Sequence, residues 1–557
     1  MLNYFMKKFL LLFIFLIFTG IFQSISAQAQ SPVWMPPGAQ TKPKSDAFSY
    51  DIGINNYNKD TYLYVNPALN MNFDGLWGFA LQMPLNLLLY DREPKMEGSK
   101  VGMLRPGDYN NKQDYQRMIN FFWVGTFGEY KPKEVTYSLY FGRMFDGYIG
   151  HGTIINRYVN NQRVDIYKLG VQADINTDYG GAQIFTNSVY DRQVNAGRAY
   201  VRPYGIGRAI FNIFRGGSVA MFPGNVIDEA GRKTVKEEVD NDKKQKRYIE
   251  VETDPVTGEQ KEVEKTADEK PADSKSNNPA ARNNPGSDSS DSIFYRLAFG
   301  YTNALDGRAP NQLDFDSTGN VKLDKYNDIQ VKNTKPVSIE GYDAEWKVIS
   351  SKYFELTPYA DYNRFRHIEG ANGRHYGAIA RIGGKEINLT IRPESRRMTS
   401  NYIPMYFDSF YEIERFQSSI ESGISTTKYE SLMSKPTDGK TVSGYYHTII
   451  LNIYNIGFEA NYEDYQGKNN SRVFIGAYVP IMSIIRFSAF YTKKGFDRSA
   501  QAFKIDDKAQ GAVELAISLG PVAVKIQDRR RWMLDPDTNS FKAKDEQMLL
   551  FSGGLSF

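Results

Sequence analysis

The chain has 557 residues, 14% of them aromatic, and its 68 Lys and Arg nearly balance its 64 Asp and Glu to give a net charge of +4. This balance gives no reason to expect nucleic acid or anionic lipid as a partner. The sequence contains no cysteine, which excludes disulfides, thiolate metal sites and the lipid-modified cysteine of a lipoprotein.

Residues 1–29 have the organisation of a secretory signal peptide. Lys7 and Lys8 precede a short apolar run at 9–18, and small residues lead to Ala27-Gln28-Ala29. The apolar run is shorter than the roughly 20 residues that a membrane-spanning helix needs. We therefore expect cleavage after Ala29 rather than a membrane anchor. Residues 30–45 follow as a short, polar, Pro-rich periplasmic lead, too short for a plug domain.

From residue 46 onward the sequence alternates between short strands and turns. The stretch Trp77 to Leu87 places apolar residues at every second position, directly after Asp74-Gly75, a pair that favours a tight hairpin. Tyr167 to Asp174 and Val513 to Leu519 repeat this period of two. Their second face carries polar and charged residues such as Glu514, as a water-filled lumen allows.

The stretch 217–290 interrupts the strands. It is polar, mixed in charge and almost free of aromatic residues, so we expect it to be disordered. Its location depends on the residues before it. If Arg198 to Phe214 is one long strand, the insert lies on the periplasmic side, and if Tyr204 to Gly207 is a turn, it lies outside the cell. We favour the periplasm.

The last strand, Gln547 to Phe557, keeps its alternation to the final residue. Four large apolar side chains share one face: Leu549, Phe551, Leu555 and Phe557. This pattern resembles the closing strand, and the sorting signal, of bacterial outer-membrane β-barrels. The resemblance implies integral location in the outer membrane of a diderm bacterium, in contact with lipid and lipopolysaccharide, and recognition by the barrel-assembly machinery.

The expected fold class is therefore all-β, a transmembrane antiparallel β-barrel over residues 46–557. Counting strands back from the C-terminus gives about 18, with a range of 16 to 20, and single-chain barrels have even numbers. The apolar row of one late strand ends near Trp532, which suits an aromatic girdle at the membrane interface.

Charged residues suggest a constriction inside the barrel. The basic set comprises Arg392, Arg396, Lys525, Arg529 and Arg531. The acidic set, Asp408, Glu412 and Glu414, lies in an aromatic patch of the long connection 393–445. Porin loops that fold into the lumen set carboxylates opposite arginines and create a transverse field. We hypothesise the same arrangement here; the alternative is a surface loop packed by its own aromatics.

The sequence indicates neither catalysis nor a cofactor. Its four histidines, His151, His367, His375 and His447, show no metal-ligand spacing and no nucleophile motif, and we expect them in solvated loops or at the barrel rim. We predict no catalytic, metal or cofactor-binding residue. An enzyme carried on a barrel would need a grouping of hydroxyl, histidine and acid that sequence does not reveal.

A barrel of this size leaves an aqueous channel rather than a filled core. The leading hypothesis is accordingly a porin-like passive pathway for small hydrophilic solutes. A second is a surface adhesin or host-interaction protein that binds extracellular ligands through its loops. A minor third is a transporter for hydrophobic compounds, because Asn66-Pro67-Ala68-Leu69 resembles an element in the hatch of long-chain fatty-acid transporters.

Overall fold

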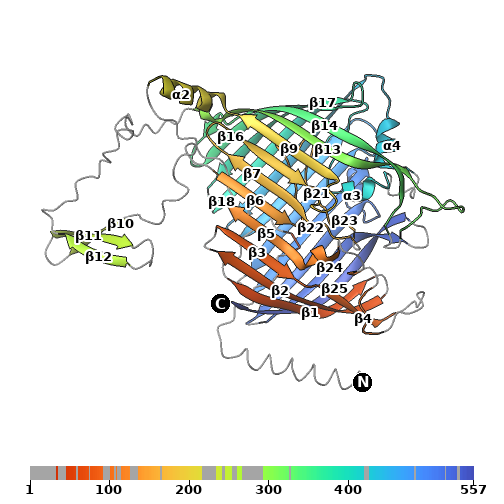
Figure 1. Cartoon of the computed structure of the whole chain (residues 1–557), viewed down its shortest axis with the longest axis horizontal. Helices are drawn as coiled ribbons and strands as arrows, with labels where there is room; N and C mark the ends of the chain where they lie inside the picture. The colour runs from red at the N-terminus through yellow and green to blue at the C-terminus, as the bar shows by residue number, and fades with distance from the viewer. Residues whose placement is uncertain are drawn as a thin grey trace, which may run out of the picture.

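A computed structural model gives the fold as one antiparallel β-sheet closed on itself (Figure 1). The structure describes the whole chain except residues 1–32, 35–45, 58–59, 74–75, 92–100, 106–107, 110–113, 126–135, 164–165, 216–233, 241–244, 254–259, 266–292, 325–327, 385, 419–425, 482–483, 521, 536–539 and 557. The predicted signal peptide therefore lies outside the described residues.

The first half of the wall is built from short strands. They are β1 (Ala47–Tyr57), β2 (Asp60–Phe73), β3 (Trp77–Gln82), β4 (Leu85–Tyr90), β5 (Ile119–Gly125), β6 (Thr136–Gly142), β7 (Gly170–Asn176), β8 (Gly180–Thr186) and β9 (Val194–Val201).

The second half has longer strands and tighter turns at one end. Its strands are β13 (Leu297–Leu313), β14 (Val331–Trp346), β15 (Ile349–Ser350), β16 (Phe354–Phe365), β17 (Asn372–Gly383), β18 (Ile387–Thr399), β19 (Thr441–Ile453), β20 (Ile456–Tyr465), β21 (Ser471–Ile481), β22 (Ile485–Phe496), β23 (Ala509–Leu519), β24 (Val522–Asp535) and β25 (Ser540–Ser556).

The 22 strand segments of this sheet make twenty barrel strands. Both β3 and β4 pair with β2, so they form one strand, interrupted at Met83-Pro84 where proline lacks the amide hydrogen of a ladder bond. In the same way β14 and β15 both pair with β16. Every residue of β1 pairs with β25, which closes the barrel. The count falls within the predicted range, although the central value of 18 was two too low.

Strand alternation puts both chain ends at one end of the barrel, because Ala47 pairs with Ser556. We call this the periplasmic end, following the prediction for the C-terminal strand. The long insert leaves β9 at Val201 and returns at Leu297, which also lie at this end. Neither reading of the preceding residues was right, since β9 stops at Val201 and a helix, α2 (Pro203–Phe214), follows it.

Within the insert the structure describes a separate three-stranded antiparallel sheet. It consists of β10 (Thr234–Asp240), β11 (Gln245–Thr253) and β12 (Gln260–Lys265). The remainder of 217–290, predicted to be disordered, lies outside the described residues. The described helical elements other than α2 are short: η2 (Asp114–Met118), η4 (Ile293–Arg296), α3 (Tyr411–Glu414), α4 (Lys428–Met433) and η5 (Ser499–Gln501). In the part of the chain that is described, no helix is long and apolar enough to cross a membrane.

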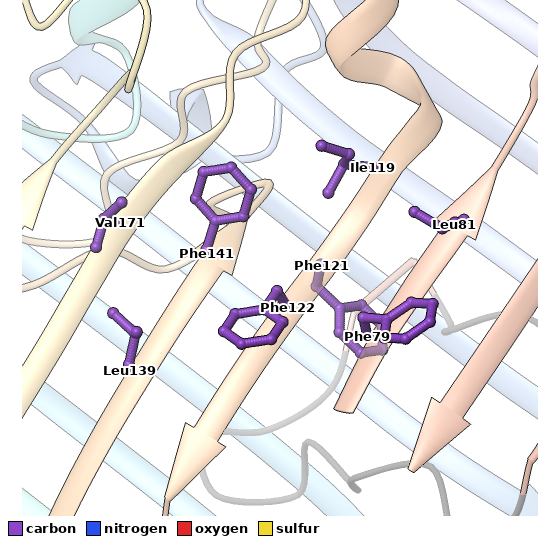
Figure 2. A pocket seen from close by; sticks show the side chains of 8 residues that line it. All are labelled: Phe79, Leu81, Ile119, Phe121, Phe122, Leu139, Phe141 and Val171. Carbon is purple, nitrogen blue, oxygen red and sulfur yellow. The ribbon is translucent and has the colours of Figure 1, made fainter. Parts of the chain in front are cut away.

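The outer face of the barrel is apolar around its circumference. Large apolar side chains that point outward and are exposed include Phe48, Trp77, Leu81, Ile184, Phe299, Tyr342, Ile382, Ile387, Ile449, Ile475, Val513, Ile526, Leu549 and Phe551. Figure 2 shows one hollow in this face, between β3, β5, β6 and β7, lined only by apolar side chains. An apolar outer belt around a closed antiparallel barrel is the architecture of an integral outer-membrane protein.

The inner face is polar, as the alternating sequence pattern predicted. On β23, Val513 is exposed on the outside whereas Glu514 is fully buried on the inside. The strand predicted from Tyr167 to Asp174 begins later than expected. β7 starts at Gly170, and Lys168 belongs to the preceding loop. The girdle prediction for Trp532 was wrong, since this side chain is fully buried.

Candidate functional site

Two connections of the extracellular end fold into the barrel and pack against its inner wall. They are the β6–β7 loop (143–169) and the β18–β19 loop (400–440). The loops pair with each other as a short parallel bridge between Ile155 and Phe407, both of which are fully buried. A continuous apolar core joins both loops to the wall strands β8, β9, β13, β14 and β16.

Helix α3 lies at the centre of the β18–β19 loop and contacts strands that are far apart around the wall. The hydroxyl of Tyr411 donates to Asp306 on β13 at 2.6 Å. The ring of Phe410 lies 5.4 Å from that of Trp532 on β24, which explains why Trp532 is buried rather than in a girdle. The loop thus bridges the lumen, as the constriction hypothesis required, and is packed by its own aromatics, as the alternative required.

The three predicted carboxylates of this loop are buried and ion-paired. Asp408 meets Lys494 of β22 at 3.0 Å and also contacts Arg472 of β21. Lys428 of α4 lies 2.6 Å from Glu414, and Lys168 of the β6–β7 loop lies 2.7 Å from Glu412. Lys494 also pairs with Glu414, so this lysine contacts two of the three carboxylates.

These pairs hold the carboxylates in their charged form. Burial alone would raise the pKa of Asp408, but the charges of Arg472 and Lys494 outweigh it and hold that pKa well below its usual range. Burial is likewise outweighed at Glu412 by Lys168, which lowers the pKa of this carboxyl. These three carboxylates are therefore neutralised by other cations, and they do not form the predicted transverse field with the arginines of β18 and β24.

His151 anchors the β6–β7 loop to strands β14 and β16 of the wall. Its Nδ1 lies 2.8 Å from Asp361 on β16 and its Nε2 lies 2.9 Å from Glu345 on β14. Its ring stacks on Tyr359 at 4.2 Å. Burial opposes a charged imidazole, but Asp361 and Glu345 raise the pKa of His151 to about 10, so it is charged and donates from both nitrogens.

The prediction of histidines in solvated loops or at the rim holds for His367, which is exposed in the β16–β17 turn. His447 is exposed on the outer face of β19, and His151 and His375 are buried. His375 Nδ1 lies 3.2 Å from Glu394 in the wall. Each buried histidine thus pairs with acids that are distant in sequence. The only local sign was the pair of glycines around His151, to which sequence reasoning assigned no role.

The basic residues of β18 are also paired locally. Arg396 is almost fully buried and lies 2.6 Å from Glu394, and Arg392 reaches the other oxygen of Glu394 at 2.7 Å. Arg396 further contacts Glu463 of β20 at 3.2 Å. These two arginines lie on the inner face of β18, where Glu394, two residues from each of them, accepts from both.

Lys525, Arg529 and Arg531 lie on the inner face of β24. Lys525 lies 3.0 Å from Asp51 on β1, and both side chains are fully buried. Arg531 lies 2.5 Å from Glu546 on β25. Arg529, between them, has no carboxylate within 4 Å among the described residues and makes no side-chain hydrogen bond there.

Arg143, at the start of the β6–β7 loop, is the second cation of this kind. In the described part of the chain it has no acidic partner, and its guanidinium is flanked by the rings of Phe145 and Tyr167 at 4.8 and 5.4 Å. Burial, with repulsion from Arg529 and Arg531, lowers the pKa of Arg143. Sequence reasoning missed Arg143 because it is not in the strand that carries the other arginines.

The residues of the predicted assembly signal are only partly described. Leu549 and Phe551 point outward, 41% and 40% exposed. Leu555 pairs with Phe48 in the closing ladder, although its side chain is not described, and Phe557 lies outside the described residues. The element Asn66 to Leu69 lies within β2 in the barrel wall and not in a hatch, so the resemblance to fatty-acid transporters does not hold.

No protein-family model and no curated protein matches the sequence. Among solved structures, OccK5 (OpdH) of Pseudomonas aeruginosa matches with 9% identity and a TM-score of 0.26, covering 92% of this chain and 98% of that one. OccK1 (OpdK) of the same organism matches with 8% identity and a TM-score of 0.28, over 92% and 98%. OccD3 (OpdP) gives 9% identity and a TM-score of 0.27, over 96% and 95%.

Proposed function

We propose that this barrel is a porin-like passive channel of the outer membrane for small hydrophilic solutes, narrowed in its extracellular half by the β6–β7 and β18–β19 loops. The observation that carries the proposal is a closed twenty-stranded wall with a charged inner face and an apolar outer face. A barrel of this size is too wide to be filled by the side chains of its own wall.

Fixed charge in the lumen favours anions. The other lumenal cations described above each have a carboxylate partner, so their charges largely cancel. Arg143 has no such partner among the described residues, and Arg529 shares the influence of Glu546 with Arg531, which pairs with that carboxylate directly. Arg143 and Arg529 also lie close enough to each other to interact electrostatically. An uncompensated positive charge on the channel wall raises the local concentration of anionic solutes.

Planar bilayers test this proposal. Purified protein should give stable conductance steps, and the reversal potential in a salt gradient should show preference for the anion. The double variant R143Q/R529Q should lose most of that preference. R530Q is the matched control, because Arg530 lies beside Arg529 on the other face of β24 and pairs with Asp545 at 2.6 Å.

The outcomes separate the two parts of the proposal. Absence of conductance steps from correctly assembled protein contradicts the channel. Steps whose ion preference is the same in wild type and R143Q/R529Q contradict the role of the two arginines alone. The adhesin alternative finds less support, because the two long loops pack inside the barrel and are not displayed outside it.

A further inference from the structure

The N-terminal lead enters the barrel at Trp34. Of residues 30–45 the structure describes only Val33 and Trp34. The backbone N–H of Trp34 donates to the Ser488 hydroxyl at 2.9 Å, and this hydroxyl donates to the carbonyl of Trp34 at 2.6 Å. Ser488 lies on the inner face of β22 and is fully buried. Trp34 is therefore held against the lumenal wall, 454 residues away in sequence.

The indole ring covers the backbone of Gly476, half way along β21. A Cβ built at Gly476 would lie 2.4 Å from Cε2 of Trp34, so the ring occupies the place that any other side chain would need. The ring of Phe474, two residues away on the same face, lies 6.2 Å from the indole. Phe474 is in turn fixed by Phe490 at 6.3 Å and by the guanidinium of Arg157 at 3.4 Å.

This arrangement recognises one kind of chemical group. The Ser488 hydroxyl accepts from an amide N–H and donates to a carbonyl of the same residue, which requires a residue with peptide bonds on both sides. The bare backbone at Gly476 and the ring of Phe474 provide a flat apolar surface for an aromatic side chain. Phe474 also supports the β6–β7 loop, through its contact with Arg157.

We propose that Gly476, Ser488 and Phe474 form a lumenal binding site for an aromatic amino-acid residue in peptide linkage, and that Trp34 is its intramolecular occupant. Short peptides with an aromatic residue are the ligand class. Trp34 precedes the start of β1 at Ala47 by only thirteen positions. A tether of this length keeps the local concentration of Trp34 in the millimolar range, so a free ligand competes with it weakly.

Equilibrium dialysis with N-acetyl-tryptophanamide tests the site, because this compound carries the indole and both amide groups. The detergent-solubilised full barrel, assembled according to its heat-modifiable mobility, should bind the probe as W34A in a 1:1 complex. The wild type should bind at least about tenfold more weakly. N-acetyl-alaninamide should bind to neither protein. The assay does not depend on conduction, so its result stands whether or not the barrel is a channel.

Second-site variants locate the bound probe. W34A/G476V should lose binding, because the added side chain fills the position of the ring. W34A/S488A should bind more weakly, because both hydrogen bonds to the probe are lost. This variant removes a single oxygen atom, so it still tests the site if W34A/G476V does not assemble. W34A/A477V is the matched control on the outer face of β21 and should bind as W34A does. Equal binding by wild type and W34A overturns the proposal, as does retention of binding in both Gly476 and Ser488 variants.

Discussion

His151 and Asp361 form a buried ion pair, 2.8 Å between Nδ1 and the carboxylate, that joins a loop residue to a wall strand 210 positions away. Glu345 on β14 holds the other ring nitrogen at 2.9 Å, so the imidazolium closes a bridge between two strands and the β6–β7 loop. The loop is thereby a fixed part of the lumen and not a mobile surface segment.

The variant H151Q should destabilise the assembled barrel. It leaves the buried carboxylate of Asp361 and the partly exposed one of Glu345 without their shared cation, and breaking the buried pair with Asp361 costs about 3 kcal/mol. The temperature at which the heat-modifiable folded form disappears should fall. H367Q, in the exposed β16–β17 turn, is the control and should leave this temperature unchanged.

The same pair predicts a loss of stability at alkaline pH. The folded-state pKa of His151, raised to about 10, exceeds the unfolded value of about 6.5. Its contribution is therefore fully present below pH 6.5 and is lost as the pH rises through 10. The melting temperatures of wild type and H151Q should converge over this interval. A constant difference from pH 6.5 to pH 10.5 would contradict the assignment.

The variant D408N should weaken the attachment of the β18–β19 loop to β21 and β22. Arg472 loses the carboxylate that it contacts in this loop and Lys494 keeps only its pair with Glu414, at a cost on the order of 3 kcal/mol. We expect larger or less steady single-channel conductance in planar bilayers, because the loop no longer keeps one position. D438N, an exposed carboxylate of the same loop, should behave as wild type.

Mild acid should not reproduce the D408N phenotype. The folded-state pKa of Asp408 is depressed, so its contribution is present above the unfolded value of about 3.9 and is lost only as the pH falls through the lower folded value. Wild-type conductance should therefore show no loop release between pH 7 and pH 4. A transition near pH 5 would mean that Asp408 is not paired in solution.

The faces of the strands could be predicted from sequence because side-chain direction in a strand has a period of two. The inward positions of Lys525, Arg529 and Glu514 follow from their neighbours alone. The choice of partner does not. Glu412 meets Lys168 over a separation of 244 residues, and no local pattern distinguishes this pair from the predicted one with the arginines of β24.

Local sequence patterns also could not predict that the loops are buried inside the barrel. An apolar residue at the end of a strand suits lipid, a membrane interface or another part of the protein, so Trp532 was placed in a girdle although Phe410 covers it. The glycines around His151 did not identify its role, because its partners lie on β14 and β16. Both errors arose where a loop returns into the barrel.

The insert should be inaccessible from outside the cell. The connection leaves the wall at Val201 and returns at Leu297, both at the end that carries the C-terminus. Trypsin added to intact cells should therefore spare the region around Lys243, and permeabilising the outer membrane should expose it. Cleavage near Lys243 in intact cells would show that the barrel has the opposite orientation, with the insert outside the cell.

Deletion of Phe557 should impair assembly of the barrel in cells. The last strand closes the wall by pairing with all of β1, and its outward row of Leu549 and Phe551 extends toward the terminal residue. If the terminal aromatic side chain is the feature that the assembly machinery reads, the deletion should reduce the amount of heat-modifiable barrel several-fold, whereas Phe557→Tyr should retain it. Replacement of Leu519, an equally apolar outward residue near the periplasmic end of β23, with Ala controls for loss of lipid contact and should have little effect. Wild-type levels in the deletion would show that the closing strand is recognised through its pairing with β1 and not through its last side chain.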